Sequence, residues 1–155
     1  MESSSLVKAM RENRSYAMAQ LVGLSNEQYL EILSGLNNNI LWNVGHILFD
    51  QCYKLYHPCG LALPVPEAYE SWFASGSSPR DWAEGPDVGE VVEKFGSVNE
   101  IVIADYEKGV FTGFHPYRLE DETPVDTIEE SIVLDLAHGG MHYGVIVTMK
   151  AVLSF

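Results

Sequence analysis

Basic residues are scarce in this sequence, which has nine Lys and Arg against 22 Asp and Glu and a formal net charge of −13. The deficit is uneven. Residues 1–80 carry seven acids and five bases, a net −2, whereas residues 81–155 carry fifteen acids and four bases, a net −11. Proteins that bind nucleic acids need a positive surface that displaces counterions from phosphates. We therefore expect no binding to DNA, RNA or anionic membrane surfaces.

Cysteine and long hydrophobic runs are also scarce. Cys52 and Cys59 lie seven positions apart, which matches neither a C-x-x-C motif nor the dense cysteine spacing of a secreted disulfide scaffold. We expect two reduced, partly buried thiols. No stretch approaches the roughly 18 uninterrupted apolar residues of a membrane span, and the segment MESSSLVKAMRENRSY has no apolar signal core. The expectation is a soluble cytoplasmic protein with no membrane partner.

Apolar residues make up 46% of the 155 positions, which is enough for one sizeable core, so we expect a single domain over residues 1–155. Four long segments, 5–23, 40–57, 88–109 and 127–153, carry apolar residues at helical spacing. Asn39, Asp87 and the pair Thr127 and Glu130 are candidate N-terminal caps. Because no convincing pair of alternating strands is present, the sequence predicts an all-α four-helix bundle.

The segments between these helices are of unequal length. Ser25 with Gln28 resembles a capping box that opens a short helical stretch through Leu33. Residues 58–86 hold five of the seven prolines and two of the three tryptophans, and they predict a long irregular connection between helices two and three, with a short helical turn over 67–73. Residues 111–124 are expected to form another loop. A connection as long as 58–86 is usually functional when it lies in a compact domain.

Three histidines form the strongest candidate site. His138 and His142 in LAHGGMHYG are four residues apart and share one helix face, and His46 lies far upstream in WNVGHIL. The segment around His138 and His142 is otherwise apolar, where unpaired imidazoles are costly to bury. Neutral imidazole is the commonest metal ligand, and catalytic sites use three protein ligands with an open position. We predict a metal triad, and the alternative is core histidines bonded to side chains or carbonyls.

Other residues are candidates for supporting the triad. Asp50, one turn after His46, could accept a ring N–H from it, and Asp135, three residues before His138, could do the same there. The alternative for both aspartates is a solvated helix face. The residues proposed for a substrate pocket are Trp42, Arg80 and Tyr143. Arg80 could hold an anionic substrate group or serve as an exposed solubilising charge, and His57 and His115 are interpreted as structural or reserve ligands.

Glycines follow the first histidine of the pair. The spacing is that of the H-E-x-x-H zinc motif, but Gly139 occupies the position of the glutamate, which excludes the usual metalloprotease. Gly139 and Gly140 each cost a helix about 1 kcal/mol relative to alanine, so either a neighbouring helix or a ligand approaches the backbone closely or the pair is a harmless weak point of the helix. Gly140 and Gly144, four residues apart, would form a flat strip for helix packing across a dimer.

With these motifs the chain resembles the DinB/YfiT-like superfamily of metal-binding four-helix bundles. The likeness rests on WNVGHIL, on the long proline-rich connection and on HGGMHYG, in that order along the chain. The resemblance implies that His46, His138 and His142 hold a divalent ion, often zinc or nickel, and that the protein is a homodimer, as is frequent among members. Members often carry Glu after the first histidine of the pair, and since Gly139 stands there, no acid–base role is carried over.

The resemblance also implies the class of reaction. Related bundles include S-transferases that use low-molecular-weight thiols, and we expect a metal-dependent enzyme of this kind acting on a small molecule. A metal can deprotonate a coordinated thiol, which then needs less help from a protein base, so the absence of a base at Gly139 favours the transferase. The alternatives are a hydrolase in which the metal activates water and a non-enzymatic metal-binding or ligand-binding bundle. Three ligands, instead of four, favour an open site, while zinc and nickel are not distinguished.

Overall fold

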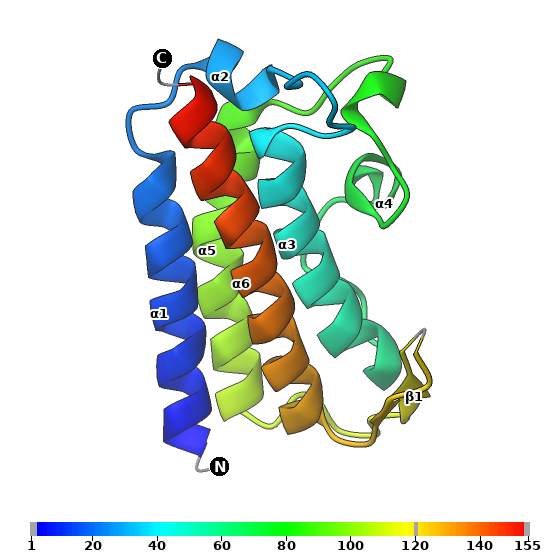
Figure 1. The fold of residues 1–155 in the computed structure, drawn as a ribbon. Coiled ribbons are helices and arrows are strands. Elements are labelled where there is room, and N and C mark those ends of the chain that lie inside the picture. Colours follow the sequence, from blue (N-terminus) through cyan, green and yellow to red (C-terminus); the bar gives the residue numbers. More distant parts are fainter. Residues whose placement is uncertain (1–2, 120, 154–155) are drawn as a thin grey trace.

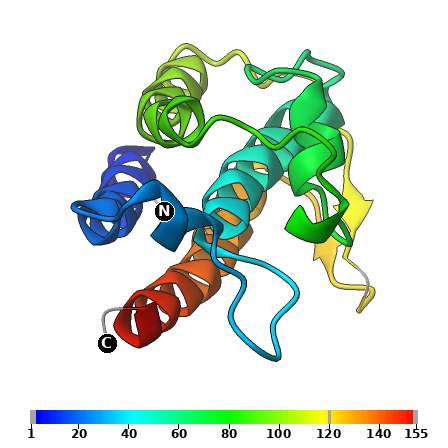
Figure 2. The same ribbon diagram turned by 90° about the horizontal axis from the view of Figure 1, so that it is seen from above.

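Four long helices packed side by side make up most of the protein in the computed structural model, which describes residues 3–119 and 121–153 (Figure 1). They are α1 (Ser3–Leu21), α3 (Ile40–Tyr56), α5 (Val88–Glu107) and α6 (Ile128–Leu153). Figure 2 views the bundle from above and shows the four helices grouped together; side chains from all four form one hydrophobic core. The predicted all-α four-helix bundle is confirmed.

The helix starts are formed by the predicted caps. Asn39 accepts a hydrogen bond from the backbone N–H of Trp42 at the start of α3, and Asp87 accepts one from Glu90 at the start of α5. Thr127 and Glu130 bond each other's backbone N–H groups before α6, which completes a capping box. Each cap satisfies N–H groups that have no partner inside the helix. These interactions are local, which is why the sequence predicts them.

Two connections differ from the prediction. The capping box at Ser25 is present, but the short helix α2 (Asn26–Leu30) ends before Leu33 because Glu31 turns to an extended backbone. The loop expected over residues 111–124 contains a small antiparallel hairpin of β1 (Tyr117–Arg118) and β2 (Pro124–Val125). Strands of two residues are too short to produce an alternating pattern in the sequence.

The long connection between α3 and α5 is more ordered than the predicted irregular segment. It contains the 3-10 turns η1 (His57–Cys59) and η2 (Pro79–Asp81) and the short helix α4 (Ala68–Phe73), which agrees with the expected turn. α4 packs beside α3 (Figure 1), with Tyr69 and Phe73 fully buried. Burial of these two aromatic side chains stabilises the connection against the bundle by several kcal/mol, at about 1.5–3 kcal/mol for a side chain of this size.

Each of the four long helices contributes one buried polar residue to a network in the core. Arg14 of α1 donates to Gln51 Oε1 of α3 at 2.8 Å and to the carbonyl of Phe95 at 2.6 Å. The Gln51 amide donates to Asn99 Oδ1 of α5 at 3.1 Å and to Asp135 Oδ2 of α6 at 3.2 Å. Buried polar groups need such partners, so the network couples the register of all four helices.

Helix α6 carries apolar residues around its whole circumference, although Asp135, His138 and His142 also lie on it. It has the length and composition of a membrane-crossing helix, and in the bundle it packs against α1 and α3. After its first turn, its exposed residues form one uncharged face, which we call the outer stripe: Val133, Ala137, Met141, Gly144, Val147, Thr148, Ala151 and Val152. An apolar helix face of this length is normally covered.

Candidate metal centre

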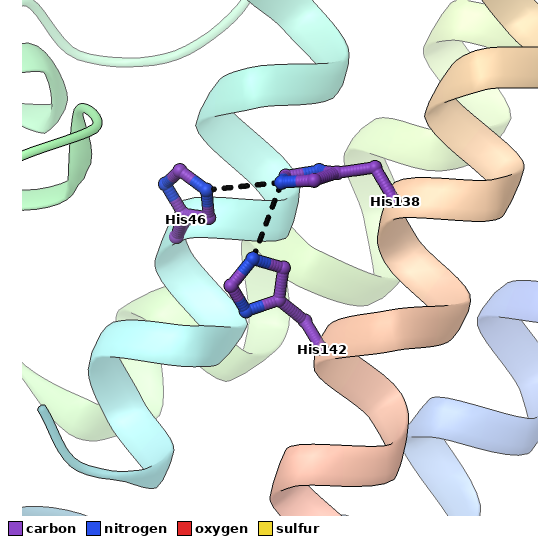
Figure 3. Close-up of side chains that lie close together, drawn as sticks. All are labelled: His46, His138 and His142. Atoms are coloured by element: carbon purple, nitrogen blue, oxygen red, sulfur yellow. Dashed lines mark hydrogen bonds between the residues drawn. The ribbon is translucent and has the colours of Figure 1, made fainter. Parts of the chain in front are cut away.

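The three histidines predicted as a triad converge between α3 and α6 (Figure 3). His138 Nε2 lies 3.3 Å from His46 Nε2 and 3.2 Å from His142 Nε2. His46 is 5% exposed, whereas His138 and His142 are only partly buried. His46 is therefore the shielded member of the group, whereas His138 and His142 are partly exposed to solvent.

The outer nitrogen of each ring faces an oxygen. His46 Nδ1 lies 2.7 Å from the carbonyl oxygen of Phe73, which can only accept, so His46 donates from Nδ1. His142 Nδ1 lies 2.8 Å from Asn43 Oδ1, and the amide of Asn43 is oriented by its own donation to the Asn39 carbonyl at 2.8 Å. His142 therefore also carries its proton on Nδ1.

The third ring contacts a carboxylate. His138 Nδ1 lies 2.9 Å from Asp50 Oδ2, an ion-pair distance without a well-aligned hydrogen bond. Lys54, one turn further along α3, pairs with the same Asp50 oxygen. A proton on Nδ1 is favoured in all three rings, and each Nε2 then presents a lone pair to the other two.

This donor set fits a divalent metal ion. Zinc bonds imidazole nitrogen at about 2.0–2.1 Å, and two such nitrogens on a tetrahedron lie about 3.3 Å apart. Two of the three separations, 3.2 and 3.3 Å, match that edge, and all three ligand atoms lie within 4.8 Å of one another. Three converging lone pairs repel one another unless a cation lies between them, and oxygen partners on each Nδ1 are the arrangement seen around metal-bound histidines. His46, His138 and His142 could thus hold a metal ion.

The electrostatics keep two of the imidazoles neutral. Burial lowers the pKa of His46, although the hydrogen bond to Phe73 opposes this. Burial, together with the neighbouring imidazoles, lowers the pKa of His142 to about 4. Burial opposes the charged form of Asp50, but His138 and Lys54 outweigh it and lower the pKa of Asp50 to about 2. Neutral rings and an ionised carboxylate are the forms that a metal site requires at neutral pH.

The two aspartates predicted to support the triad lie elsewhere than expected. Asp50 contacts His138 and not His46, because the Nδ1 of His46 is already bonded to the Phe73 carbonyl. Asp135 does not bond His138. It is buried in the core network, where Gln51 donates a hydrogen bond to it. Burial raises the pKa of Asp135, and the charge of Arg14 partly offsets this rise.

The three residues proposed for a substrate pocket are placed differently from one another. Trp42 stacks on the ring of His46, with centroids 4.6 Å apart and an interplanar angle of 8°, and it donates to Ser77. Arg80 is exposed and donates to the carbonyl of Leu36, away from the triad. Tyr143 packs against the hydrophobic core, since it lies about 100° around α6 from His142. Of these three proposed pocket residues, Trp42 is the one with a described contact to the triad.

Sequence reasoning missed Asn43 and the carbonyl of Phe73 as partners of the triad. Asn43 is a polar residue within the apolar run ILWNVGHIL, and that contrast is a signal that could have found it. A backbone carbonyl leaves no such signal. The one indirect sign of the Phe73 carbonyl in the sequence is Gly45, since a Cβ at that position would lie 2.3 Å from the ring of Phe73. Glycine there permits the approach of α4 to α3.

The glycines of α6 have different surroundings. A Cβ on Gly139 would lie 3.2 Å from the side chain of Asn13 and 3.7 Å from Ile47, so α1 and α3 approach α6 closely at this point. Gly140 and Gly144 face open space. The close approach predicted for this glycine pair therefore holds for Gly139, and Gly139 faces neighbouring helices.

A helical bundle that gathers three imidazoles between its second and fourth long helices defines a class of candidate metal proteins. Comparison with protein families gives the family itself: the DinB superfamily model matches residues 9–146. The chain belongs to the DinB superfamily, as the resemblance implied. A search of curated proteins finds no match.

Proposed function

We propose that the protein is a metal-dependent enzyme that transfers a small-molecule thiol to an electrophilic small molecule. His46, His138 and His142 would hold the divalent ion, zinc or nickel. The observation that carries the proposal is the convergence of three Nε2 atoms whose Nδ1 partners are all oxygens. When bound, the ion would lower the pKa of a coordinated thiol or water molecule so that a nucleophile forms at neutral pH.

An open site is supported by the number of ligands. Structural zinc sites are usually closed by four protein ligands, whereas catalytic sites use three and leave a position for an exogenous molecule. The triad has three, and His138 and His142 are only partly buried. Trp42, which covers one face of His46, provides an apolar wall beside the site.

The thiol is favoured over water by the lack of a positioned base. The carboxylate that contacts the triad is Asp50, and it is held by Lys54 and His138. Gly139 provides no side chain where many relatives have Glu. In the proposed reaction the thiol sulfur forms a bond to the electrophilic carbon, and the leaving group departs with its electron pair and takes up the proton that the thiol lost.

Metal content is the first test. Untagged protein purified without chelators is expected to carry about one divalent ion per chain. His142→Ala should lose the ion, whereas His57→Ala, which removes an exposed histidine outside the triad, should keep it. A His142→Ala variant that loses the ion but retains the wild-type melting temperature indicates a functional site. Wild-type protein without a divalent ion would overturn the proposal.

Activity is the second test. The metal-loaded protein is incubated with a panel of cellular thiols and electrophiles, and thioether products are quantified by mass spectrometry. Product that depends on both the ion and His142 supports the transferase. Hydrolysis of the electrophile without any thiol would replace the transferase by a hydrolase, and the absence of any turnover would favour a binding protein.

We also propose that the protein forms a homodimer through the outer stripe of α6. The stripe carries no charge, although 20% of all residues are charged, and Met141 and Val152 are 59% and 53% exposed. A second copy of the stripe is an uncharged surface of the same kind, and Gly144 allows close helix approach. Met141→Glu should convert the dimer to a monomer in light scattering, whereas Val22→Glu, at an exposed position outside the stripe, should not. A monomeric wild type would contradict the proposal.

A further inference from the structure

A hollow lies at the C-terminal end of α3, beside the hairpin of β1 and β2. Figure 1 shows where these elements meet. Its volume is about 480 Å³, which is within the range of small-molecule sites. The lining comes from the last turn of α3, from the turn η1 and from the segment before and within β1. The residues that carry the argument are Tyr53, Lys54, His57, His115 and Tyr117.

Hydrogen bonds between separate segments fix the walls of this hollow. The backbone N–H of His115 donates to the carbonyl of Pro58 at 2.8 Å. The Ser131 hydroxyl of α6 donates to the carbonyl of Lys54 at 3.0 Å, which leaves its oxygen to accept from the Tyr117 hydroxyl, also at 3.0 Å. The ring of Tyr53 stacks on that of His57 with centroids 4.6 Å apart. The hollow is therefore built before any ligand arrives.

The charge of the lining is opposite to that of the protein. Lys54 and two imidazoles provide N–H donors, and no carboxylate lines the hollow among the described residues. In a chain of net charge −13, such a place is an exception that can attract a small anion. Lys54 pairs with Asp50, but an ammonium has three N–H groups and retains donors for a ligand.

The shape of the lining indicates what kind of anion fits. Tyr53, His57 and Tyr117 contribute flat rings, and two prolines complete apolar walls. Flat apolar walls bind an aromatic or unsaturated body, and the basic groups bind an oxyanion attached to it. We propose that this hollow binds a small organic carboxylate with a flat apolar body.

The hollow also lies next to the candidate metal centre. Asp50 contacts both Lys54, which lines the hollow, and His138, which belongs to the triad. Asp50 and Lys54 both lie on α3, about 6 Å apart along the helix axis. A substrate held by its carboxylate at Lys54 would be separated from the triad by the side chain of Asp50. This use of the hollow rests on the proposed function, but carboxylate binding itself does not.

Binding is tested on the full-length protein freed of metal, so that its outcome does not depend on the metal centre. Benzoate is titrated by NMR, with benzamide as the neutral isostere and phosphate as the anion without an apolar body. Benzoate should shift the ring signals of Tyr53 and His57 and bind about tenfold more tightly than benzamide. Phosphate should compete weakly.

Two variants locate the interaction. Lys54→Met should weaken benzoate binding by about tenfold, and His115→Ala, which does not contact Asp50, should weaken it by about three- to tenfold. Lys8→Met removes the same charge from an exposed site on α1 and should bind benzoate as wild type does. Equal affinity for benzoate and benzamide, equal affinity for benzoate and phosphate, or wild-type binding by both hollow variants would overturn the proposal. Retained benzoate binding in a protein that fails the metal tests would refute the proposed function alone.

Discussion

Gly45 of α3 lies against the ring of Phe73 of α4, so close that a Cβ on Gly45 would come within 2.3 Å of the ring atom Cε1. The next residue, His46, bonds the carbonyl of the same Phe73. The contact between a glycine and an aromatic ring therefore determines where the first histidine of the triad finds its acceptor.

Gly45→Ala is expected to displace α4 and to weaken zinc binding. Because Phe73 is fully buried, the overpacking should cost about 1–3 kcal/mol of the free energy of unfolding. Urea unfolding and zinc titration measure the two effects. Gly96→Ala is the matched control, because its Cβ would meet only the flexible end of Met18 at 3.4 Å. Equal behaviour of the two variants would contradict the role of Gly45.

Asn43→Ala should lower zinc affinity by about 10- to 100-fold, since it removes the oxygen that orients His142. The free His142 ring can then rotate its lone pair away from the triad. Competition with a chromogenic chelator measures the affinity. Asn37→Ala, which changes an exposed asparagine close to α3, is the control and should bind zinc like the wild type. Unchanged affinity in Asn43→Ala would show that the triad is oriented without this side chain.

Acid should destabilise the zinc-free protein through His142. Its pKa is about 4 in the folded protein, whereas an unperturbed histidine, as in the unfolded chain, has a pKa of 6.5. Between these pH values the unfolded chain binds more protons than the folded protein, so stability rises with pH. The stabilisation is present above about pH 6.5 and is lost as the pH falls toward 4. Asn at this position does not titrate.

Comparison of the wild type with His142→Asn isolates this contribution from other titrating groups. The difference in unfolding free energy, wild type minus variant, should increase from pH 4 to 6.5 and stay flat above it. Zinc binding by His142 in the folded protein should weaken only as the pH approaches about 4, where protons begin to compete for the ring nitrogen. A difference that grows on acidification would have the wrong sign.

The buried network should respond cooperatively to substitution. Gln51→Leu removes hydrogen-bond partners of Arg14, Asn99 and Asp135 together, and the loss should be about 1–3 kcal/mol because buried donors and acceptors are left unsatisfied. In a double-mutant cycle, Arg14→Met combined with Asp135→Leu should cost less than the sum of the single changes. Urea unfolding at neutral pH measures each variant, and additive losses would refute the coupling.

Local features of the fold were predictable from the sequence. Helices appear as apolar periodicity, and the caps at Asn39, Asp87 and Thr127 involve residues three positions apart. The convergence of the three histidines followed from helix spacing and from the family resemblance, and the structure brings their ring nitrogens together.

Tertiary features were not predictable in the same way. Asp50 and Asp135 were placed on the correct helices, but their partners depend on how α3 and α6 face each other across the bundle. The acceptor of His46 is a backbone carbonyl 27 positions away in the sequence. Every residue has such a carbonyl, so the type of side chain at that position does not predict the contact. The hairpin is too short to leave a pattern, and the hollow near Lys54 needs segments that meet only in the folded chain.

The bond from His46 to a carbonyl of α4 gives the proline-rich connection an influence over the triad. Any change of sequence or length between α3 and α5 that tilts α4 would alter how strongly the His46 ring donates electrons to a bound metal ion. The three histidines that hold the ion would be unchanged. Relatives with identical histidines and different connections should therefore differ in metal preference and reactivity.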